Sequence, residues 1–300
     1  MSSLAIKTDN LVKVFGEKRA VDGLNLSIGK GMIYGFLGPN GCGKTTTLRM
    51  LCGVLSPSEG EIALLGESVT PYPMKIRSKI GYMSQNFSLY NELSVIENLN
   101  FYALLYGLEG KEKKRRIEDL IEVTKLTEYR NTLARNLSGG WRQRLALAVA
   151  IIHQPEVLFL DEPTSGVDPV SARLFWDIVY ELAAEGVSIV VSTHSMDEAE
   201  HCDKVGFLDK GHLLQEGSPA ELRKAFPAKM VSIRTDKPMQ LSHELSERFG
   251  SQMHSYIFGN EVRIRLENDD EQMLKEYEYR RVEPTLEDIF VYMTEHNSVA

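Results

Sequence analysis

The chain contains the stretch GPNGCGKT at residues 38–45, and this stretch decides its fold. It follows an apolar run at residues 32–37 that is typical of a buried strand, and it leads into a helical segment at residues 43–51. Glycines let the backbone wrap closely around an anion, and a helix that starts there turns N–H groups and its positive dipole end toward that anion. The stretch therefore predicts a phosphate-binding loop, because a plain glycine-rich turn does not require this spacing between a strand and a helix.

The loop predicts particular contacts to a nucleotide. Lys44 is expected to reach the outer phosphates, and the hydroxyl of Thr45 is expected to bind Mg²⁺. Charge-assisted hydrogen bonds of this kind contribute roughly 1.5–3 kcal/mol each. The residues expected to contact the nucleotide in this loop are Gly38, Pro39, Asn40, Gly41, Cys42, Gly43, Lys44, Thr45 and Thr46.

Polar residues follow two further apolar runs that are typical of buried strands. Asp161 and Glu162 follow the run at residues 157–160, and His194 follows the run at residues 187–193. Because ligands bind at the carboxyl ends of parallel strands, Asp161 is expected to organise Mg²⁺ and Glu162 to orient or deprotonate the attacking water. His194 could donate to a γ-phosphate, although a histidine at such a position is by itself more often an ordinary core or surface residue.

Strand and helix patterns alternate along most of the chain, which predicts an α/β fold with a parallel sheet. Between about residues 87 and 144 the pattern is helical and predicts an inserted subdomain, with Val95, Leu99, Tyr102 and Leu105 on the apolar face of its first helix. A boundary near Phe226 and Pro227 predicts two domains, over residues 1–226 and 227–300, and the second has the pattern of a small α+β domain. The other predicted strands cover residues 5–14, 23–28, 60–65, 80–83, 230–235 and 262–266.

Composition restricts the class of protein. The net charge of −8 argues against a primary nucleic-acid partner, because phosphate backbones attract basic surfaces. Three cysteines suggest reduced thiols in a cytosol-like compartment. We find no secretory signal at the N-terminus and no apolar stretch of membrane-spanning length. The basic run at residues 113–116 is interpreted as a solvated helix face, and the spacing of His194, His201 and Cys202 does not match a metal site.

Residues 4–218 resemble the nucleotide-binding subunits of ABC transporters, and the motifs occur in the order found in that family. The segment at residues 137–140, Leu-Ser-Gly-Gly, resembles the family signature, which is presented to the ATP of a second subunit. Its chemistry agrees, since Ser138 can cap a helix and the amides of Gly139 and Gly140 can approach a phosphate. The remaining matches are Phe15 as the adenine-stacking aromatic, Gln85 as the glutamine that senses Mg²⁺ and the membrane partner, Asp168 in the loop linking the two sites, and His194 as the switch histidine.

The resemblance implies an architecture and a mechanism. The fold expected is a P-loop ATPase core with an N-terminal antiparallel β-subdomain and an inserted helical subdomain, followed by the small α+β domain. Two such subunits, identical or different, would hold two ATP molecules with Mg²⁺ between them and close when ATP binds. The helical subdomain would pass this motion to a separate transmembrane permease subunit. The chain is then expected to be cytoplasmic and peripheral on the inner face of the cell membrane.

Two residues depart from the family pattern. Trp141 stands where the family most often has a polar residue or methionine, which puts the local contact after the signature glycines in question. Cys42 replaces the small residue usual in the phosphate loop and could make the site sensitive to thiol reagents.

The C-terminal segment at residues 282–290 resembles the ending of ATPases that serve ABC-2-type exporters, including drug-resistance exporters of the daunorubicin type. An ATPase that energises such an exporter is therefore the function expected. A soluble ATPase of the same fold acting on the ribosome or nucleic acid, or a regulatory ATP-binding interaction protein, is the alternative. The sequence does not identify the cargo.

Overall fold

The computed structural model describes residues 4–69, 74–85, 88–250, 253–266 and 271–297. These residues form two compact units, an N-terminal unit that ends at Ser218 and a C-terminal unit that begins at Pro219. The division falls before the predicted boundary near Phe226, since the short helix α8 (Pro219–Lys224) packs against α10 (Leu286–Asn297) of the C-terminal unit.

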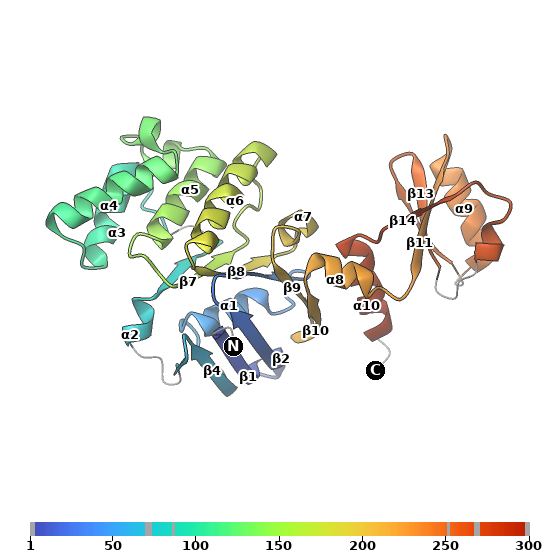
Figure 1. The fold of residues 1–300 in the computed structure, drawn as a ribbon, viewed down its shortest axis with the longest axis horizontal. Coiled ribbons are helices and arrows are strands. Elements are labelled where there is room, and N and C mark those ends of the chain that lie inside the picture. Colours follow the sequence, from blue (N-terminus) through green and yellow to red (C-terminus); the bar gives the residue numbers. More distant parts are fainter. Residues whose placement is uncertain (1–3, 70–73, 86–87, 251–252, 267–270, 298–300) are drawn as a thin grey trace. The chain divides into compact units, whose positions relative to one another are not determined.

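A six-stranded sheet forms the centre of the N-terminal unit (Figure 1). Its strand order is β10-β9-β3-β8-β7-β6, and all neighbours are parallel except β9 and β10. Every residue of β3, β7 and β8 is buried, as the continuous apolar runs predict for strands covered on both faces. The bounds are β3 Ile33–Leu37, β6 Ile80–Met83, β7 Val157–Asp161, β8 Ser188–Thr193, β9 Lys204–Asp209 and β10 His212–Gly217.

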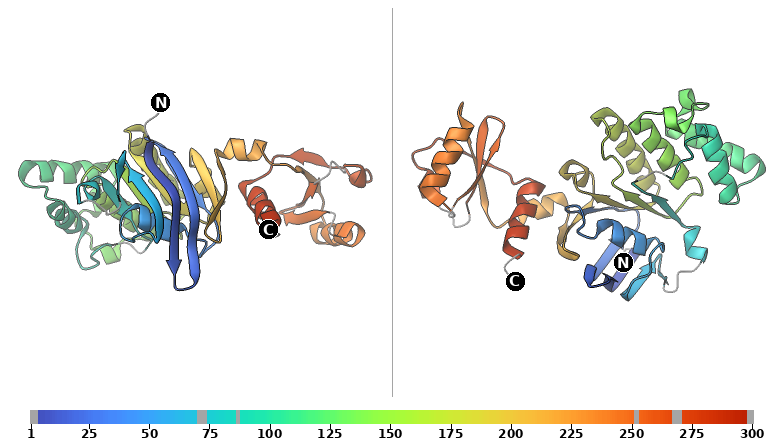
Figure 2. Two further views of the ribbon diagram at one scale, coloured as in Figure 1. Left: turned by 90° about the horizontal axis from the view of Figure 1, so that it is seen from below. Right: turned by 180° about the vertical axis from the view of Figure 1, so that it is seen from behind.

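A second, antiparallel sheet lies on one side of the central sheet, with helix α1 (Lys44–Leu51) between them (Figures 1 and 2). Its strand order is β2-β1-β4-β5. Apolar residues of both sheets and of α1 form one core, which fixes the start of α1 against the end of β3. The bounds are β1 Leu4–Phe15, β2 Lys18–Gly29, β4 Glu59–Leu64 and β5 Glu67–Ser68.

Helices cover the other side of the central sheet (Figure 1). Ser94 begins the first of them with a reciprocal capping box to Glu97, which explains why the helix starts there. Val95 and Leu99 are buried as predicted, but Leu105 is 66% exposed and does not belong to the buried face. The bounds of these helices are α3 Val95–Leu105, α4 Gly110–Val123, α5 Gly139–Ala150, α6 Pro169–Ala184 and α7 Met196–Ala199. The short helix α2 (Met74–Arg77) lies on the side of α1, where Ile76 joins the core of the antiparallel sheet (Figure 1).

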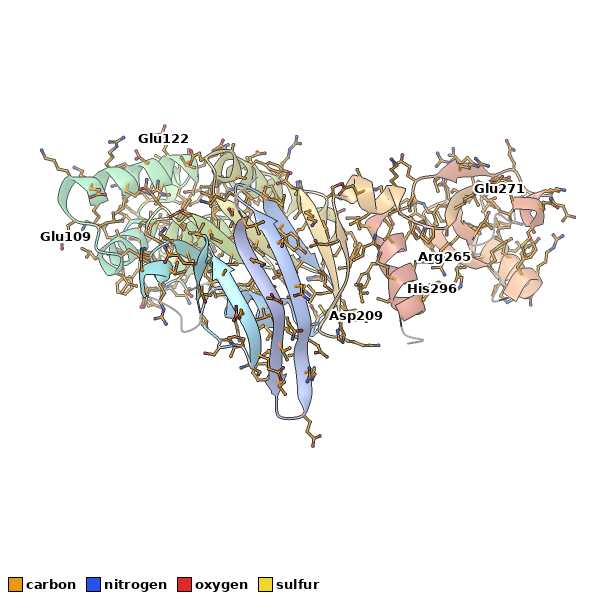
Figure 3. All side chains as sticks on the ribbon, turned by 60° about the horizontal axis from the view of Figure 1, so that its bottom comes forward. Glu109, Glu122, Asp209, Arg265, Glu271 and His296 are labelled. Carbon is orange, nitrogen blue, oxygen red and sulfur yellow. The ribbon has the colours of Figure 1, made fainter. Side chains whose placement is uncertain are left out.

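The helical subdomain also presents charged side chains at its outer helix. Glu109 precedes α4 at its N-cap position and Glu122 lies near its other end, so the two carboxylates mark opposite ends of the helix (Figure 3). Ile117, Leu120 and Ile121 form the buried face of α4. The interpretation of residues 113–116 as a solvated face is wrong for Arg116, which is half-buried and donates to the carbonyl oxygens of Ile151 and Ile152.

The C-terminal unit contains a four-stranded antiparallel sheet with the order β12-β13-β11-β14. With α9 (Pro238–Phe249) after the first strand and a single helical turn (Glu271–Leu274) after the third, this is the strand order of a ferredoxin-like fold whose second helix is reduced to one turn. Apolar residues of the sheet and α9 form a core of their own. The bounds are β11 Lys229–Arg234, β12 His254–Phe258, β13 Glu261–Leu266 and β14 Arg280–Val282.

Helix α10 packs on the C-terminal unit through polar contacts. Arg265 on β13 is paired with Glu295 of α10 at 2.7 Å, and Tyr256 on β12 donates to Asp288 at 2.8 Å. Arg265 and His296 are both labelled in this unit in Figure 3. Within the described residues, no helix is both long enough and apolar enough to cross a membrane.

Candidate functional site

The loop at residues 38–45 joins the end of β3 to the start of α1. Gly43 is the N-cap of α1 and has φ 113°, a conformation that glycine adopts without strain. A Cβ atom there would lie 2.4 Å from the carbonyl oxygen of Ala20, so a larger residue would require a movement of the backbone. Gly43 is therefore required both by its dihedral angle and by the close packing of the loop against β2.

Lys44 is almost completely buried beneath the loop. Its Nζ donates to the carbonyl oxygens of Gly38 at 2.7 Å and Pro39 at 3.0 Å. Only 4% of the residue is exposed. The cation is thus held at the inner side of the loop, where the backbone N–H groups of the first turn of α1 are also directed.

Asp161 lies at the end of β7 and connects three neighbouring elements. Its Oδ1 accepts from the hydroxyl of Thr45 at 3.0 Å and from the hydroxyl of Ser192, and its Oδ2 accepts from the hydroxyl of Tyr82 at 3.4 Å. Burial and, next, the negative charge of Asp161 raise the pKa of Tyr82 to about 12, so the phenol remains a donor at neutral pH. This network fixes the Asp161 carboxylate beside the Thr45 hydroxyl.

Glu162 is held by contacts to two predicted site residues. Gln85 donates from Nε2 to Oε2 of Glu162 at 2.9 Å, and Nδ1 of His194 lies 3.4 Å from the same oxygen. The backbone of Glu162 has φ 49°, which is uncommon for a residue with a side chain, and its N–H donates to the Ser192 carbonyl at 2.9 Å. The strand ends therefore bring Gln85, Glu162 and His194 together.

A cleft of about 470 Å³ contains much of this chemistry. Phe15 lines it and is half exposed, with the ammonium of Lys13 5.2 Å from the ring centroid. The side chains that line the cleft are Phe15, Lys18, Ala20, Asn40, Gly41, Gly43, Lys44, Thr45, Thr46, Gln85 and Glu162. The cleft therefore combines an exposed aromatic ring with the glycine-rich loop, a pairing that can stack on a base and bind phosphates.

The signature segment, residues 137–140, lies apart from this group and does not line the cleft. Ser138 occupies the N-cap position of α5, but its side chain makes no capping hydrogen bond, in contrast to the prediction from the sequence. Gly140 is packed closely, since a Cβ atom there would lie 2.4 Å from Cβ of Ser171. Gly139 is less restricted, with Val167 Cγ2 at 3.9 Å as the nearest atom to such a Cβ.

Asp168 is the N-cap residue of α6 and also lies outside the cleft. Its Oδ1 accepts from the backbone N–H of Ser171 at 3.0 Å. This hydrogen bond holds the pKa of the Asp168 carboxyl below its ordinary value. Because Ser171 also faces Gly140, the start of α6 connects Asp168 to the signature segment within one chain.

Comparison with known proteins places this arrangement in a family. Residues 21–165 match the ABC transporter family. The daunorubicin/doxorubicin resistance ATP-binding protein DrrA of Streptomyces peucetius is 39% identical over 231 residues, which cover 77% of this chain and 70% of that protein. The Nod factor export ATP-binding protein I of Paraburkholderia xenovorans is 33% identical over 303 residues and 98% of both chains. The chain belongs to the ABC transporter ATP-binding proteins.

A third relative differs in length. The probable multidrug ABC transporter ATP-binding protein YbhF of Escherichia coli is 43% identical over 218 residues, which cover 73% of this chain but 38% of YbhF. This ABC protein thus spans well under half of the length of that relative.

Solved ABC structures confirm the predicted fold class. The cbiO1 protein of Clostridium perfringens, part of the ABC transporter complex cbiONQ, aligns with a TM-score of 0.69 and 26% identity, over 82% of this chain and 96% of that one. A dimeric ABC cassette in a post-hydrolysis state with ADP and phosphate aligns with a TM-score of 0.66 and 27% identity, over 71% of this chain and 98% of that one.

The phosphate loop of this ABC protein shields its cysteine. Cys42 is only 3% exposed, and burial raises the pKa of its thiol above the ordinary value. Since the thiolate is the reactive form, this environment opposes the sensitivity to thiol reagents suggested by the sequence. The carbonyl oxygen of Cys42 accepts from the N–H of Gly211 at 2.9 Å, so the turn between β9 and β10 also supports the loop.

Four neighbours of the site were not predicted from the sequence. Lys18 and Ala20 line the cleft, and Tyr82 and Ser192 hold Asp161. Tyr82 and Ser192 are polar residues near the carboxyl ends of buried strands, which is the same signal that identified Asp161. Lys18 has no comparable signal, because its position depends on the pairing of β1 with β2.

Proposed function

We propose that this ABC protein binds and hydrolyses ATP and thereby energises an ABC-2-type exporter. The observation that carries the proposal is the convergence at one edge of the central sheet. Lys44 and Thr45 of the phosphate loop, the Asp161 network, and the Gln85–Glu162–His194 group all lie at carboxyl ends of neighbouring parallel strands or directly after them.

The residues beside Thr45 fit Mg²⁺. The hydroxyl of Thr45 and the carboxylate of Asp161 are 3.0 Å apart, and both are hard oxygen ligands of the kind that Mg²⁺ takes together with phosphates. The described residues contain no group of three or more His, Cys, Asp or Glu side chains that could hold a metal, which suits an ion held in part by the nucleotide. Gln85 lines the same cleft and completes the proposed set. When bound, Mg²⁺ neutralises negative charge on the phosphates.

In the proposed reaction Glu162 is the general base. Its carboxylate orients the attacking water and accepts its proton, while Gln85 and His194 fix the position of the carboxylate through their contacts to Oε2. Lys44 stabilises negative charge on the outer phosphates, and Phe15 stacks on adenine. His194 contacts Glu162 but does not line the cleft, and its proposed second role is to donate to the γ-phosphate.

The second half of each site is proposed to come from another subunit. Ser138, Gly139, Gly140 and Asp168 lie outside the cleft that Lys44 lines. In a dimer these residues would meet the ATP held by the partner's loop, so that ATP favours the closed form and hydrolysis allows reopening. The related ABC cassette solved with ADP and phosphate is a dimer, which supports this arrangement.

The proposed membrane partner is a separate permease subunit that holds this chain on the inner face of the membrane. The helical subdomain presents exposed apolar side chains on and beside α3, and these suit a protein partner. They are Tyr90, Phe101, Leu104, Leu105 and Tyr106. The names of the relatives, drug resistance and Nod factor export, favour an exporter over an ATPase acting on the ribosome or nucleic acid.

Glu162→Gln tests the proposal most directly. The amide keeps the shape of the side chain but cannot accept the proton, so hydrolysis should fall by about 10²–10⁴-fold while ATP binding remains. The measurement pairs phosphate release with nucleotide affinity and with size-exclusion chromatography in ATP, where the variant should accumulate as a dimer.

Glu156→Gln is the matched control, because Glu156 lies before β7 and its exposed carboxylate pairs with the half-buried Lys79 at 2.9 Å. It should hydrolyse ATP at the rate of the unmodified chain. Normal hydrolysis by Glu162→Gln would show that another group is the base. Co-purification of ribosomes or DNA, in place of a multi-span membrane protein, would contradict the exporter assignment.

A further inference from the structure

Trp141, the residue that departs from the family pattern, lies in an aromatic and cationic cluster at the start of α5. Its ring centroid is 4.2 Å from that of Tyr129, the last residue of the short 3-10 helix Thr127–Tyr129. On the same helix, Cζ of Arg144 lies 3.7 Å from the centroid of the Trp141 ring. Residues 141 and 144 are three positions apart, so they are neighbours on one helix face.

The guanidinium of Arg144 is buried, and two of its nitrogens lack the hydrogen bonds that usually stabilise a buried charge. The residue is 2% exposed, and its Nε and Nη1 have no hydrogen-bond partner among the described residues. A buried charge without a partner is unfavourable, whereas a guanidinium over an indole face is a favourable contact that strengthens when water is excluded. The Trp141 ring is therefore the main compensating group in contact with Arg144.

The cluster lies where the signature segment meets the Asp168 loop. Gly140 approaches Ser171 so closely that a Cβ atom would clash with it, and Ser171 donates to Asp168. Burial lowers the pKa of Arg144, and the negative charge of Asp168 opposes that effect. Because Gly140, Trp141 and Arg144 all belong to the first two turns of α5, a movement of Arg144 would shift the part of the helix that packs on Ser171.

We propose that Trp141 is a positioning residue for the signature half-site: it holds Arg144 in place and so fixes the first turn of α5 against the Asp168 loop. The proposal rests on the proposed ATPase function, since it assigns the role to dimer closure and hydrolysis. Trp141 does not line the cleft around Lys44, so binding of ATP to that cleft does not depend on it. The indole at this position, where a polar residue or methionine is expected from the resemblance, provides the flat surface on which Arg144 stacks.

The physical contact is tested first, without reference to activity. Trp141→Leu, Arg144→Met and the double variant are unfolded in urea and their midpoints are compared. If the stack is real, the loss in the double variant is smaller than the sum of the single losses. Strictly additive losses would remove the stack from the proposal. A failure of ATP hydrolysis in the unmodified chain would instead overturn the proposed function and leave this result untouched.

The functional role is tested by measuring kcat and nucleotide affinity separately for each variant. Trp141→Leu should reduce kcat by about tenfold, which corresponds to about 1.4 kcal/mol, with the nucleotide affinity unchanged. Trp141→Phe retains an aromatic face and should restore most of the rate. Phe258→Leu is the matched control, because Phe258 lies under Arg263 with a Cζ–centroid distance of 4.0 Å in the C-terminal unit.

Two results would overturn the positioning role. One is a kcat of the Trp141→Leu variant equal to that of Phe258→Leu, and the other is a loss of ATP affinity that accounts for the whole effect. A spectroscopic check uses the fact that the chain has only two tryptophans. In a Trp176→Phe background the emission reports Trp141 alone, and Arg144→Met should increase its quenching by acrylamide. Unchanged quenching would contradict the stack.

Discussion

The two halves of the nucleotide machinery differ in how their polar groups are satisfied. At the phosphate loop, Lys44, Asp161 and Glu162 all have hydrogen-bond or ionic partners within the chain. At the signature segment, Ser138 is exposed and its hydroxyl makes no capping hydrogen bond. The phosphate-loop half is thus organised by one chain, whereas the signature half presents an exposed hydroxyl that its own helix does not use. This contrast supports a site completed by a second subunit.

Breaking the phosphate-loop half should have the largest effect. Lys44→Ala removes the buried cation that faces the phosphates, so ATP affinity should fall by about a hundredfold or more, as expected for the loss of charge-assisted hydrogen bonds. Isothermal titration with ATP and Mg²⁺ measures the change. Lys18→Ala is the control on the exposed wall of the same cleft and should weaken binding much less. Equal losses in the two variants would mean that only net charge matters.

Breaking the signature half should change turnover and stability but leave affinity intact. Gly140→Ala places a methyl group 2.4 Å from Cβ of Ser171, and overpacking of this kind destabilises a protein by about 1–3 kcal/mol. Phosphate release should fall, while titration with ATP gives the affinity of the unmodified chain. Gly139→Ala is the packing control, because its methyl group would have no atom nearer than 3.9 Å. An unfolding midpoint of Gly140→Ala equal to that of Gly139→Ala would refute the close approach.

The smallest change in stability is expected from substitution of Asp168. Its dependence on pH shows whether the hydrogen bond to Ser171 stabilises the start of α6. The folded-state pKa of Asp168 is lowered by the Ser171 N–H, so its stabilisation is present above the ordinary aspartate pKa of about 4 and is lost as pH falls through the lowered value. Asp168→Ala should therefore lower the unfolding midpoint slightly at pH 7, and the difference from the unmodified chain should narrow below about pH 4. Asp168→Asn keeps a capping side chain, so its unfolding midpoint should lie between those of the unmodified chain and of Asp168→Ala.

A midpoint difference for Asp168→Ala that grows on acidification would contradict the assigned hydrogen bond. Urea unfolding at several pH values gives the comparison. Asp177→Ala, a change on the same helix outside its first turn, provides the background pH dependence of the chain.

The central elements could be predicted because local signals and burial agree there. The apolar runs that became β3 and β7 end at Gly38 and Asp161, the run that became β6 ends at Ser84, and these boundaries were placed nearly as observed. Strands β9 and β10 were not predicted, because their sequences are broken by Gly206 and Gly211 and mixed with charged residues. Their places depend on pairing with β3 and on the turn beneath the phosphate loop, neither of which is visible in a local window.

In the site, too, local sequence predicted some residues, whereas contacts between distant segments could not be predicted. The strand-end rule identified Asp161, Glu162 and His194, and a glutamine after β6 was matched by resemblance. The hydrogen bond of Gln85 to Glu162 and the stack of Trp141 on Arg144 depend on side-chain directions in three dimensions. The accessory fold was predicted only as α+β, since its ferredoxin-like strand order arises from long-range pairing of β11 with β14 and β13.

The left-handed backbone of Glu162 has a consequence for how this chain can change. A side chain at φ 49° is tolerated at the expense of folding free energy, on the order of 1–3 kcal/mol for such conformations. Selection for thermal stability alone would therefore favour glycine at this position and eliminate the carboxylate with it. At this residue, thermal stability and the rate of hydrolysis therefore favour different amino acids. A more stable variant that keeps Glu162 would have to gain its stability through substitutions at other positions.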